Sequence, residues 1–155
     1  NLGPSMQRGY DKAVSQFSRN LLAIVKKSLT LGIPPMGGGV TWQPLSPATI
    51  ERWGQHPIYN LTGLYSRSVG LYRYKSRVLI GLPIGTRRSS QKKLTLNQLA
   101  MMLEFGSSDG RIPPRPVWAP SLKAAGGKNK LKQLILTEIR KELQKYGVRP
   151  NQVKW

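Results

Sequence analysis

The sequence predicts a domain of the α+β class, with helices at both ends of the chain and a β-hairpin near its middle. Apolar side chains recur at helical spacing over residues 10–31 and again over residues 131–146. Between these segments, residues 71–74 and 78–82 are rich in β-branched and aromatic side chains and flank a short polar turn. Two strands joined so tightly must be antiparallel, so the expected sheet is built on this hairpin.

The first part of the chain is expected to hold one long helix and one short one. The long helix should end by Gly32, because two prolines follow it closely and disfavour helical backbone in the residues before them. A loop rich in proline and glycine follows at residues 33–40. Ser46 can then act as an N-cap with Pro47 at the first helical position, which predicts a short helix to about Trp53.

The segments on either side of the hairpin also carry local signals. Residues 61–68 predict a second short turn or helix. Thr95 and Gln98 are typical of a capping box, and the helix that they open should stop at Gly106. Residues 112–118 should be extended, because proline fixes its own φ and biases the residue before it away from helix.

Length and composition suit a single compact domain, which we place at residues 1–147, with a C-terminal tail at residues 148–155. The chain contains no cysteine, so disulfides, thiolate catalysis and cysteine-based metal sites are excluded. The longest apolar runs fall far short of the roughly 20 residues that a membrane helix needs. The first residues also lack the charged-then-apolar pattern of a signal segment. We therefore expect no association with a membrane.

The strongest compositional signal is charge, because 25 lysines and arginines against six aspartates and glutamates give a formal net charge of +19. A charge of this size repels other copies of the chain and attracts anions over a long range. The expected partners are acidic protein surfaces or nucleic acid, and a solvated basic face is the remaining alternative. Arg87, Arg88, Lys92 and Lys93 form a dense basic group, which we interpret as an exposed loop that binds a partner or DNA.

Residues suited to catalysis are scarce, which argues against an enzyme. His56 is the only histidine and lies beside a proline in a turn-rich stretch, so a structural role is expected for it. Glu138 and Glu142 share a helix face with lysines and arginines, which predicts an ordinary solvated surface. The glycines at 37–39 are not followed by the Gly-Lys-Ser/Thr sequence of a phosphate-binding loop. We therefore expect no catalytic residue, no metal site and no cofactor.

Five local patterns follow one another in a fixed order along the chain. They are Trp42-x-Pro44-Leu45-Ser46-Pro47-x-Thr49-Ile50, Leu61-Thr62-Gly63-x-x-x-x-Ser68, Val78-Leu79-Ile80-Gly81, Glu104-Phe105-Gly106 and Ile112-Pro113-Pro114-Arg115-Pro116. In this combination, over residues 40–122, the chain resembles the virion morphogenesis and tail-completion proteins of tailed bacteriophages. One departure is that Val117-Trp118 follows the proline segment, where that family usually has Phe-Leu.

The resemblance implies a small, mainly antiparallel β-sheet with a long N-terminal helix, a mid-chain helix and a C-terminal helix packed on it. It also implies a non-enzymatic subunit of a cyclic ring, commonly six-fold, in the neck where the DNA-filled head joins the tail. The implied partners are neighbouring connector or adaptor proteins, tail-tube or tail-terminator proteins, and DNA contacted without sequence specificity in the channel. The implied location is the virion neck, after synthesis in the host cytoplasm.

The patterns further imply structural roles for their residues. Leu61 and Leu64 should be buried ahead of the hairpin, and Phe105 should anchor the end of the mid-chain helix. The motif residues with an expected structural role are Trp42, Pro44, Leu61, Thr62, Gly63, Glu104, Phe105 and Gly106.

The proline segment should pass over a surface or a sheet edge, because prolines lack the N–H groups that a central strand needs. Two interpretations remain open for it. The segment is either an interface for another protein chain or a strap over the core of its own domain. The residues assigned to the interface are Ile112, Pro113, Pro114, Arg115, Pro116 and Trp118.

A basic nucleic-acid-binding protein of ribosomal or packaging type is the alternative function, since it would explain the charge directly. A ring about 40 Å tall would surround only about two dozen phosphates of a DNA duplex. Six copies of a chain with a charge of +19 carry far more charge than that. Acidic protein neighbours therefore account better for much of the basic surface.

Overall fold

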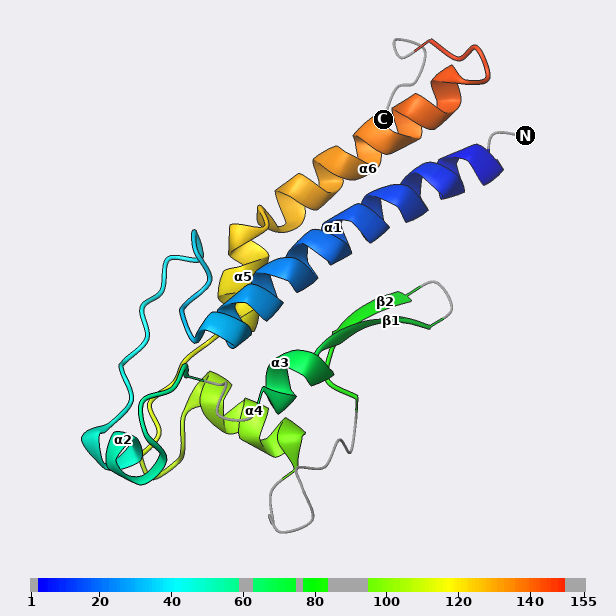
Figure 1. Cartoon of the computed structure of the whole chain (residues 1–155). Coiled ribbons are helices and arrows are strands. Elements are labelled where there is room, and N and C mark those ends of the chain that lie inside the picture. Colours follow the sequence, from blue (N-terminus) through cyan, green and yellow to red (C-terminus); the bar gives the residue numbers. More distant parts are fainter. Residues whose placement is uncertain (1–2, 59–62, 75–76, 84–94, 150–155) are drawn as a thin grey trace.

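The computed structural model describes residues 3–58, 63–74, 77–83 and 95–149, and it confirms the α+β class (Figure 1). The two strands form an antiparallel hairpin in which Leu71 lies opposite Ile80 and Tyr74 opposite Arg77. The turn expected at residues 75–76 lies outside the described residues. The elements are α1 (Gly3–Leu31), α2 (Pro47–Trp53), α3 (Leu64–Ser68), β1 (Gly70–Tyr74), β2 (Arg77–Gly81), α4 (Leu96–Phe105), α5 (Trp118–Ala124) and α6 (Gly127–Gln144).

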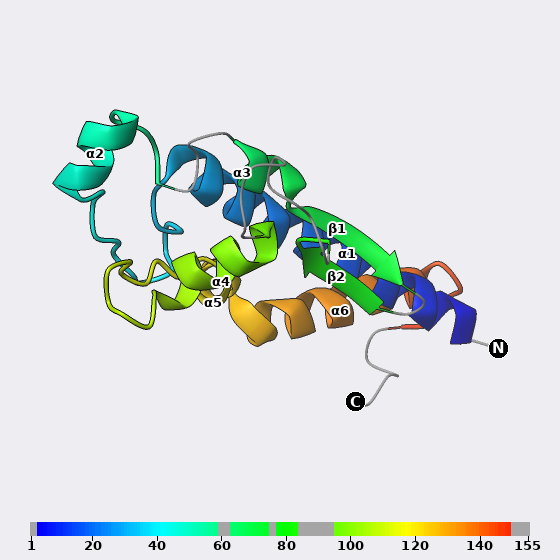
Figure 2. The same ribbon diagram turned by 90° about the horizontal axis from the view of Figure 1, so that it is seen from below.

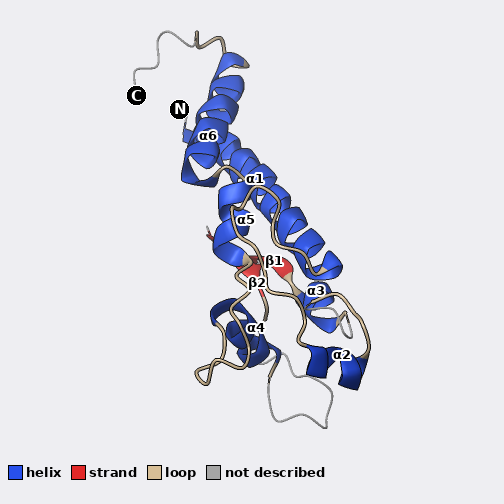
Figure 3. Ribbon diagram, turned by 90° about the vertical axis from the view of Figure 1, so that its left-hand side faces the viewer, coloured by secondary structure: helices blue, strands red, loops and turns tan. Residues whose placement is uncertain are grey.

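Helices α1 and α6 lie side by side and form a long helical hairpin (Figures 1 and 3). Phe17 of α1 and Leu143 of α6 are buried. Gly9 allows the two backbones to approach closely, because a Cβ atom at this position would lie only 2.6 Å from the Cα of Ile139. Any larger residue at position 9 therefore forces the two helices apart.

Helix α1 begins at Gly3, several residues before the apolar periodicity that predicted it. The buried residues in this added part are small, namely Ser5 and Gly9. Small residues allow close helix contact without adding to a hydrophobic pattern, so no periodic signal marks this part of the helix. The helix ends at Leu31, as the glycine and prolines that follow it predict.

The main core lies where the C-terminal half of α1 meets α3, α4 and the proline segment. Val25 and Leu29 of α1 are fully buried there against Tyr65 of α3, Leu96 of α4 and Val117. The β-hairpin lies along α1, and the Arg73 guanidinium donates a hydrogen bond to the Ser15 hydroxyl. The hairpin is therefore held by a polar contact as well as by packing.

The predicted caps of the two middle helices are confirmed. The Ser46 hydroxyl accepts a hydrogen bond from the backbone N–H of Thr49 at 3.3 Å, with Pro47 at the first position of α2. Thr95 and Gln98 form the reciprocal bonds of a capping box at the start of α4. Gly106 follows α4 with a positive φ of 81°, which a residue with a side chain rarely adopts.

Two elements in the last third differ from the expectation. Residues 112–117 are extended, but α5 begins at once at Trp118, a helix that the sequence did not predict. It is too short to show a helical period, and its N-terminus is stabilised by a residue from another element, Glu104. Helix α6 ends at Gln144, just before the expected stop at Gly147.

We distinguish two parts of the molecule, which meet at the main core; Figure 2 shows the chain from below. The helical arm comprises α1, the β-hairpin, α5, α6 and residues 145–149. The pocket lobe comprises the described residues of 32–69 and 95–117, and therefore contains α2, α3 and α4. The ends of the described chain lie at the far end of the arm, away from α2 (Figure 1).

Candidate functional site

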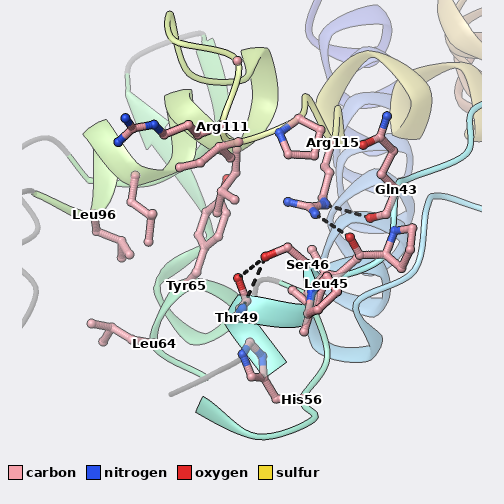
Figure 4. A pocket seen from close by; sticks show the side chains of 18 residues that line it. Gln43, Leu45, Ser46, Thr49, His56, Leu64, Tyr65, Leu96, Arg111 and Arg115 are labelled. Carbon is pink, nitrogen blue, oxygen red and sulfur yellow. Dashed lines mark hydrogen bonds between the residues drawn. The ribbon is translucent and has the colours of Figure 1, made fainter. Parts of the chain in front are cut away.

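Three of the motif segments meet at one place, which we call the motif junction. The Trp42 indole N–H donates a hydrogen bond to the carbonyl oxygen of Pro116 at 3.1 Å. The Arg115 guanidinium donates to the carbonyl oxygens of Gln43 and Pro44, each at 3.1 Å (Figure 4). Arg115 is only 5% exposed, so its side chain ties two stretches of backbone together inside the lobe.

Glu104 forms the third link of the motif junction. Its carboxylate is buried and accepts hydrogen bonds from the backbone N–H groups of Val117 at 2.8 Å and Trp118 at 3.2 Å. These groups stand at the start of α5, where Val117 offers no capping side chain of its own. A carboxylate at a helix N-terminus satisfies free N–H donors and lies at the positive end of the helix. Glu104 therefore caps α5 from the end of α4.

The proline segment is packed against its own lobe around Trp118. The buried hydroxyl of Tyr65 accepts a hydrogen bond from the Trp118 indole, and burial raises the pKa of Tyr65 to about 12. The Arg115 N–H also donates to the carbonyl oxygen of Leu103 at 2.7 Å. These contacts are those expected of a strap over the core. Pro114 of the same segment is exposed. An interface role for the segment stays a prediction.

A cavity of about 570 Å³ opens beside the motif junction, between α2, α3, α4 and residues 110–115 (Figure 4). Much of its wall is apolar. Polar side chains also line it, namely Gln43, Ser46, Thr49, His56, Arg111 and Arg115. The Nε2 atom of His56 is buried and has no hydrogen-bond partner among the described residues. The apolar side chains that line the cavity include Leu45, Ile58, Leu64, Leu96, Leu99 and Leu103.

Charge is divided unevenly between the arm and the lobe. Of the 19 lysines and arginines that the structure describes, only four lie in the pocket lobe, and one of these, Arg115, is buried. The other fifteen lie on the helical arm. The six acidic residues are split equally, so the described lobe has a formal charge of +1 and the described arm +12. Among the described residues, the excess of positive charge therefore lies on the arm.

The acidic residues of α6 are not an ordinary solvated face, contrary to the expectation. Glu142 is only 4% exposed, and it pairs with Lys145 of its own helix and with Arg8 and Lys12 of α1. The side chains of Lys12 and Lys145 lower the pKa of Glu142 to about 2. Glu138 pairs with Lys141 at 2.7 Å. The sequence placed both glutamates on one helix but could not show that α1 would supply cations to Glu142.

The outcomes for the remaining predicted residues are mixed. Leu64 is half-buried against the core, and Gly63 precedes α3 with a positive φ of 65°. The expectation that Phe105 anchors the end of α4 was wrong, because its side chain is 74% exposed. The basic loop residues Arg87, Arg88, Lys92 and Lys93, and the motif residues Leu61 and Thr62, lie outside the described residues. The partner-binding role of that loop stays a prediction.

The described residues contain no group of three or more histidines, aspartates and glutamates that could hold a metal ion. None of the helices in the described part is long and apolar enough to cross a membrane. Comparisons with protein families, curated proteins and solved structures find no match for this chain. Any functional proposal for this chain therefore rests on the residues of the motif junction and on the geometry around it.

Proposed function

We propose that this chain is a non-enzymatic structural subunit of a tailed bacteriophage, one copy of a cyclic ring in the neck or tail-completion region. The ring, six-fold in this proposal, joins the DNA-filled head to the tail and surrounds the DNA channel. Its neighbours are connector or adaptor proteins on one side and tail-tube or tail-terminator proteins on the other. The proposal rests on the resemblance carried by the five ordered patterns.

The motif junction is the observation that best supports this proposal. Trp42 lies far from Glu104 and Arg115 in the chain, and the resemblance is what first grouped the three residues. In the structure Trp42 and Arg115 each bond to the backbone of the other's pattern, and Glu104 bonds to Val117 and Trp118, which directly follow the proline pattern. A set of chance matches has no reason to interlock in this way, whereas the signature of a single fold does.

The division of charge fits a subunit with different neighbours on different sides. The described residues of the pocket lobe have a formal charge of only +1, so this surface can meet another copy without strong repulsion. The basic arm suits an acidic protein surface or DNA. A ring needs both kinds of contact, because each copy touches its own kind as well as the neighbouring rings.

The test is the mass and shape of the full-length chain, measured by native mass spectrometry and electron microscopy, with and without duplex DNA. The expected result is a closed ring with a central opening that changes little when DNA is added at physiological salt. Antibodies against the chain should label the neck in preparations of virions that contain it. A solitary subunit per virion, with no copy-to-copy contact, would rule out the ring.

A nucleic-acid-binding protein is the second candidate, and the charge of the helical arm is the observation that favours it. Such a protein would bind DNA as a monomer, and its affinity would fall steeply with salt because each neutralised phosphate releases counterions. The same mass measurement separates the two functions. A monomer that binds DNA tightly, with a strong dependence on salt, favours the second candidate.

A further inference from the structure

Two large apolar side chains on α4 are left in solvent. Met101 is 62% exposed and Phe105 is 74% exposed, and they lie one helical turn apart. The leucines that α4 contributes to the cavity, Leu96, Leu99 and Leu103, lie on the other side of the helix at 3.6 residues per turn. One helix therefore forms part of the cavity wall with one face and an apolar projection with the opposite face.

We propose that copies of this chain join head to tail by inserting Met101 and Phe105 of one copy into the cavity of the next. A projection and a cavity on opposite sides of a helix cannot meet within one molecule. If the contact repeats from copy to copy, each projection is buried and each cavity is filled. Such a head-to-tail contact generates a closed ring when a whole number of the rotations between successive copies makes a full turn. This inference rests on the proposed ring function and names the contact that builds the ring.

The size and lining of the cavity fit this occupant. A volume of about 570 Å³ lies within the range of sites that enclose a drug-sized molecule. One phenyl ring and one thioether chain from a neighbouring helix are smaller than this volume, so the cavity has room for both. Leucine and isoleucine side chains supply much of the wall, which suits apolar side chains better than a charged ligand.

Charge also favours a second copy at this site. Residues 94–110, which contain α4, include no lysine or arginine in a chain of net charge +19. Their two carboxylates already have partners in the same chain, because Glu104 caps α5 and Asp109 pairs with Arg111 at 3.3 Å. The C-terminal end of a helix carries partial negative charge on its last carbonyl groups. The cavity that would receive this end of α4 is lined by Arg111 and His56. The projection therefore brings no cation of its own to the Arg111 side of the cavity, so this contact avoids the repulsion expected between two basic arms.

The contact can be tested with one variant on each side of it. Phe105→Ser removes the projection and keeps the cavity. Thr49→Arg places a long charged side chain at the cavity wall and keeps the projection. The hydrogen bond by which Ser46 caps α2 uses the backbone N–H of Thr49, so the cap survives this substitution. Tyr74→Ser is the matched control, because it removes an aromatic ring that is 63% exposed on β1. Thermal melts should show that all three variants stay folded.

Sedimentation velocity of the full-length chains should be measured over a range of concentrations at about 0.5 M salt, where repulsion between arms is screened. The wild type and Tyr74→Ser should form species larger than a dimer. Phe105→Ser and Thr49→Arg should each stay monomeric, with at least a tenfold weaker association. An equal mixture of the two should form heterodimers and nothing larger, because only one projection and one cavity remain to meet.

Three outcomes would overturn the inference. Assembly of Phe105→Ser at the wild-type level would show that copies meet elsewhere, and the ring proposal would stand without this contact. A mixture that yields no heterodimer would exclude insertion of one copy into the next. A wild type that stays monomeric at every concentration and salt would overturn both this contact and the proposed ring.

Discussion

Glu104 lies on α4 but caps the N-terminus of α5, a role that the N-cap residue of the helix itself usually has. Its two oxygens accept the N–H groups at the start of α5, and its own position at the end of α4 fixes the distance between the two helices. Hydrogen bonds to a carboxylate are stronger than neutral ones. One side chain thus sets both the start of α5 and the path of the proline segment that leads into it.

Removing the Glu104 carboxylate should destabilise the fold. Glu104→Ala leaves two buried N–H groups without this acceptor, and an unsatisfied buried group costs about 1–3 kcal/mol. Glu104→Gln keeps one acceptor oxygen, so its loss should be smaller. The free energy of unfolding, obtained from urea titrations, checks both. Glu51→Ala, which removes an exposed carboxylate from α2, should change stability by less than about 0.5 kcal/mol.

The Glu142 cluster makes stability depend on pH in the acid range. Contacts with Lys12 and Lys145 lower the pKa of Glu142 to about 2, below its ordinary value of 4.5. A lowered pKa in the folded state stabilises the protein fully above pH 4.5, and this contribution is lost as the pH falls toward 2. The melting temperature of the wild type should therefore fall toward that of Glu142→Gln over this interval. Parallel curves for the two proteins would show that the cluster contributes nothing.

Among the secondary-structure elements, the contact between α1 and α6 depends on Gly9, a residue without a side chain. Gly9 costs helix stability compared with alanine, yet it stands where α1 touches the backbone of α6. The long-range contact therefore overrides the local preference. The ion pairs of Glu142 with Arg8 and Lys12 join the same two helices near this point.

Gly9→Ala should destabilise the helical hairpin although alanine is the better helix former. Overpacking costs about 1–3 kcal/mol, against a gain of about 1 kcal/mol in helix propensity. Asn20→Ala, at an exposed position of the same helix, should be neutral or slightly stabilising. Thermal and urea unfolding measure both changes. Stabilisation by Gly9→Ala would show that the helices can separate at this point without loss.

Elements defined by local signals could be predicted from the sequence, and those defined by distant partners could not. The caps at Ser46 and Thr95 and the two strands depend on neighbours within a few residues, so their patterns are visible in the chain. Helix α5 depends on Glu104, thirteen residues before its N-cap. The cavity likewise requires α2, α3 and α4 to meet, and no periodicity records that meeting.

Among the described residues of the molecule, positive charge is concentrated on the helical arm, which predicts where anionic partners bind. A variant that combines Lys128→Gln, Lys130→Gln and Lys132→Gln should bind polyaspartate, a surrogate for an acidic protein, about tenfold more weakly. Each exposed ion pair that is lost contributes roughly 0.5 kcal/mol to this change. The matched control replaces Arg52, Arg67 and Arg111 of the lobe with glutamine. It removes the same number of charges and should bind nearly as the wild type does. Equal losses in the two variants would contradict a dedicated basic arm.

The charges of the described residues give them an electric moment that runs from the pocket lobe to the helical arm. The field of an acidic body exerts a torque on such a subunit before any contact is made. Approaching subunits therefore arrive with the arm first, and the cavity and the apolar projection of α4 trail behind, open to the next copy. Orientation of this kind raises the rate of association and does not change the rate of dissociation. Added salt should accordingly slow attachment strongly while leaving the rate of departure almost unchanged.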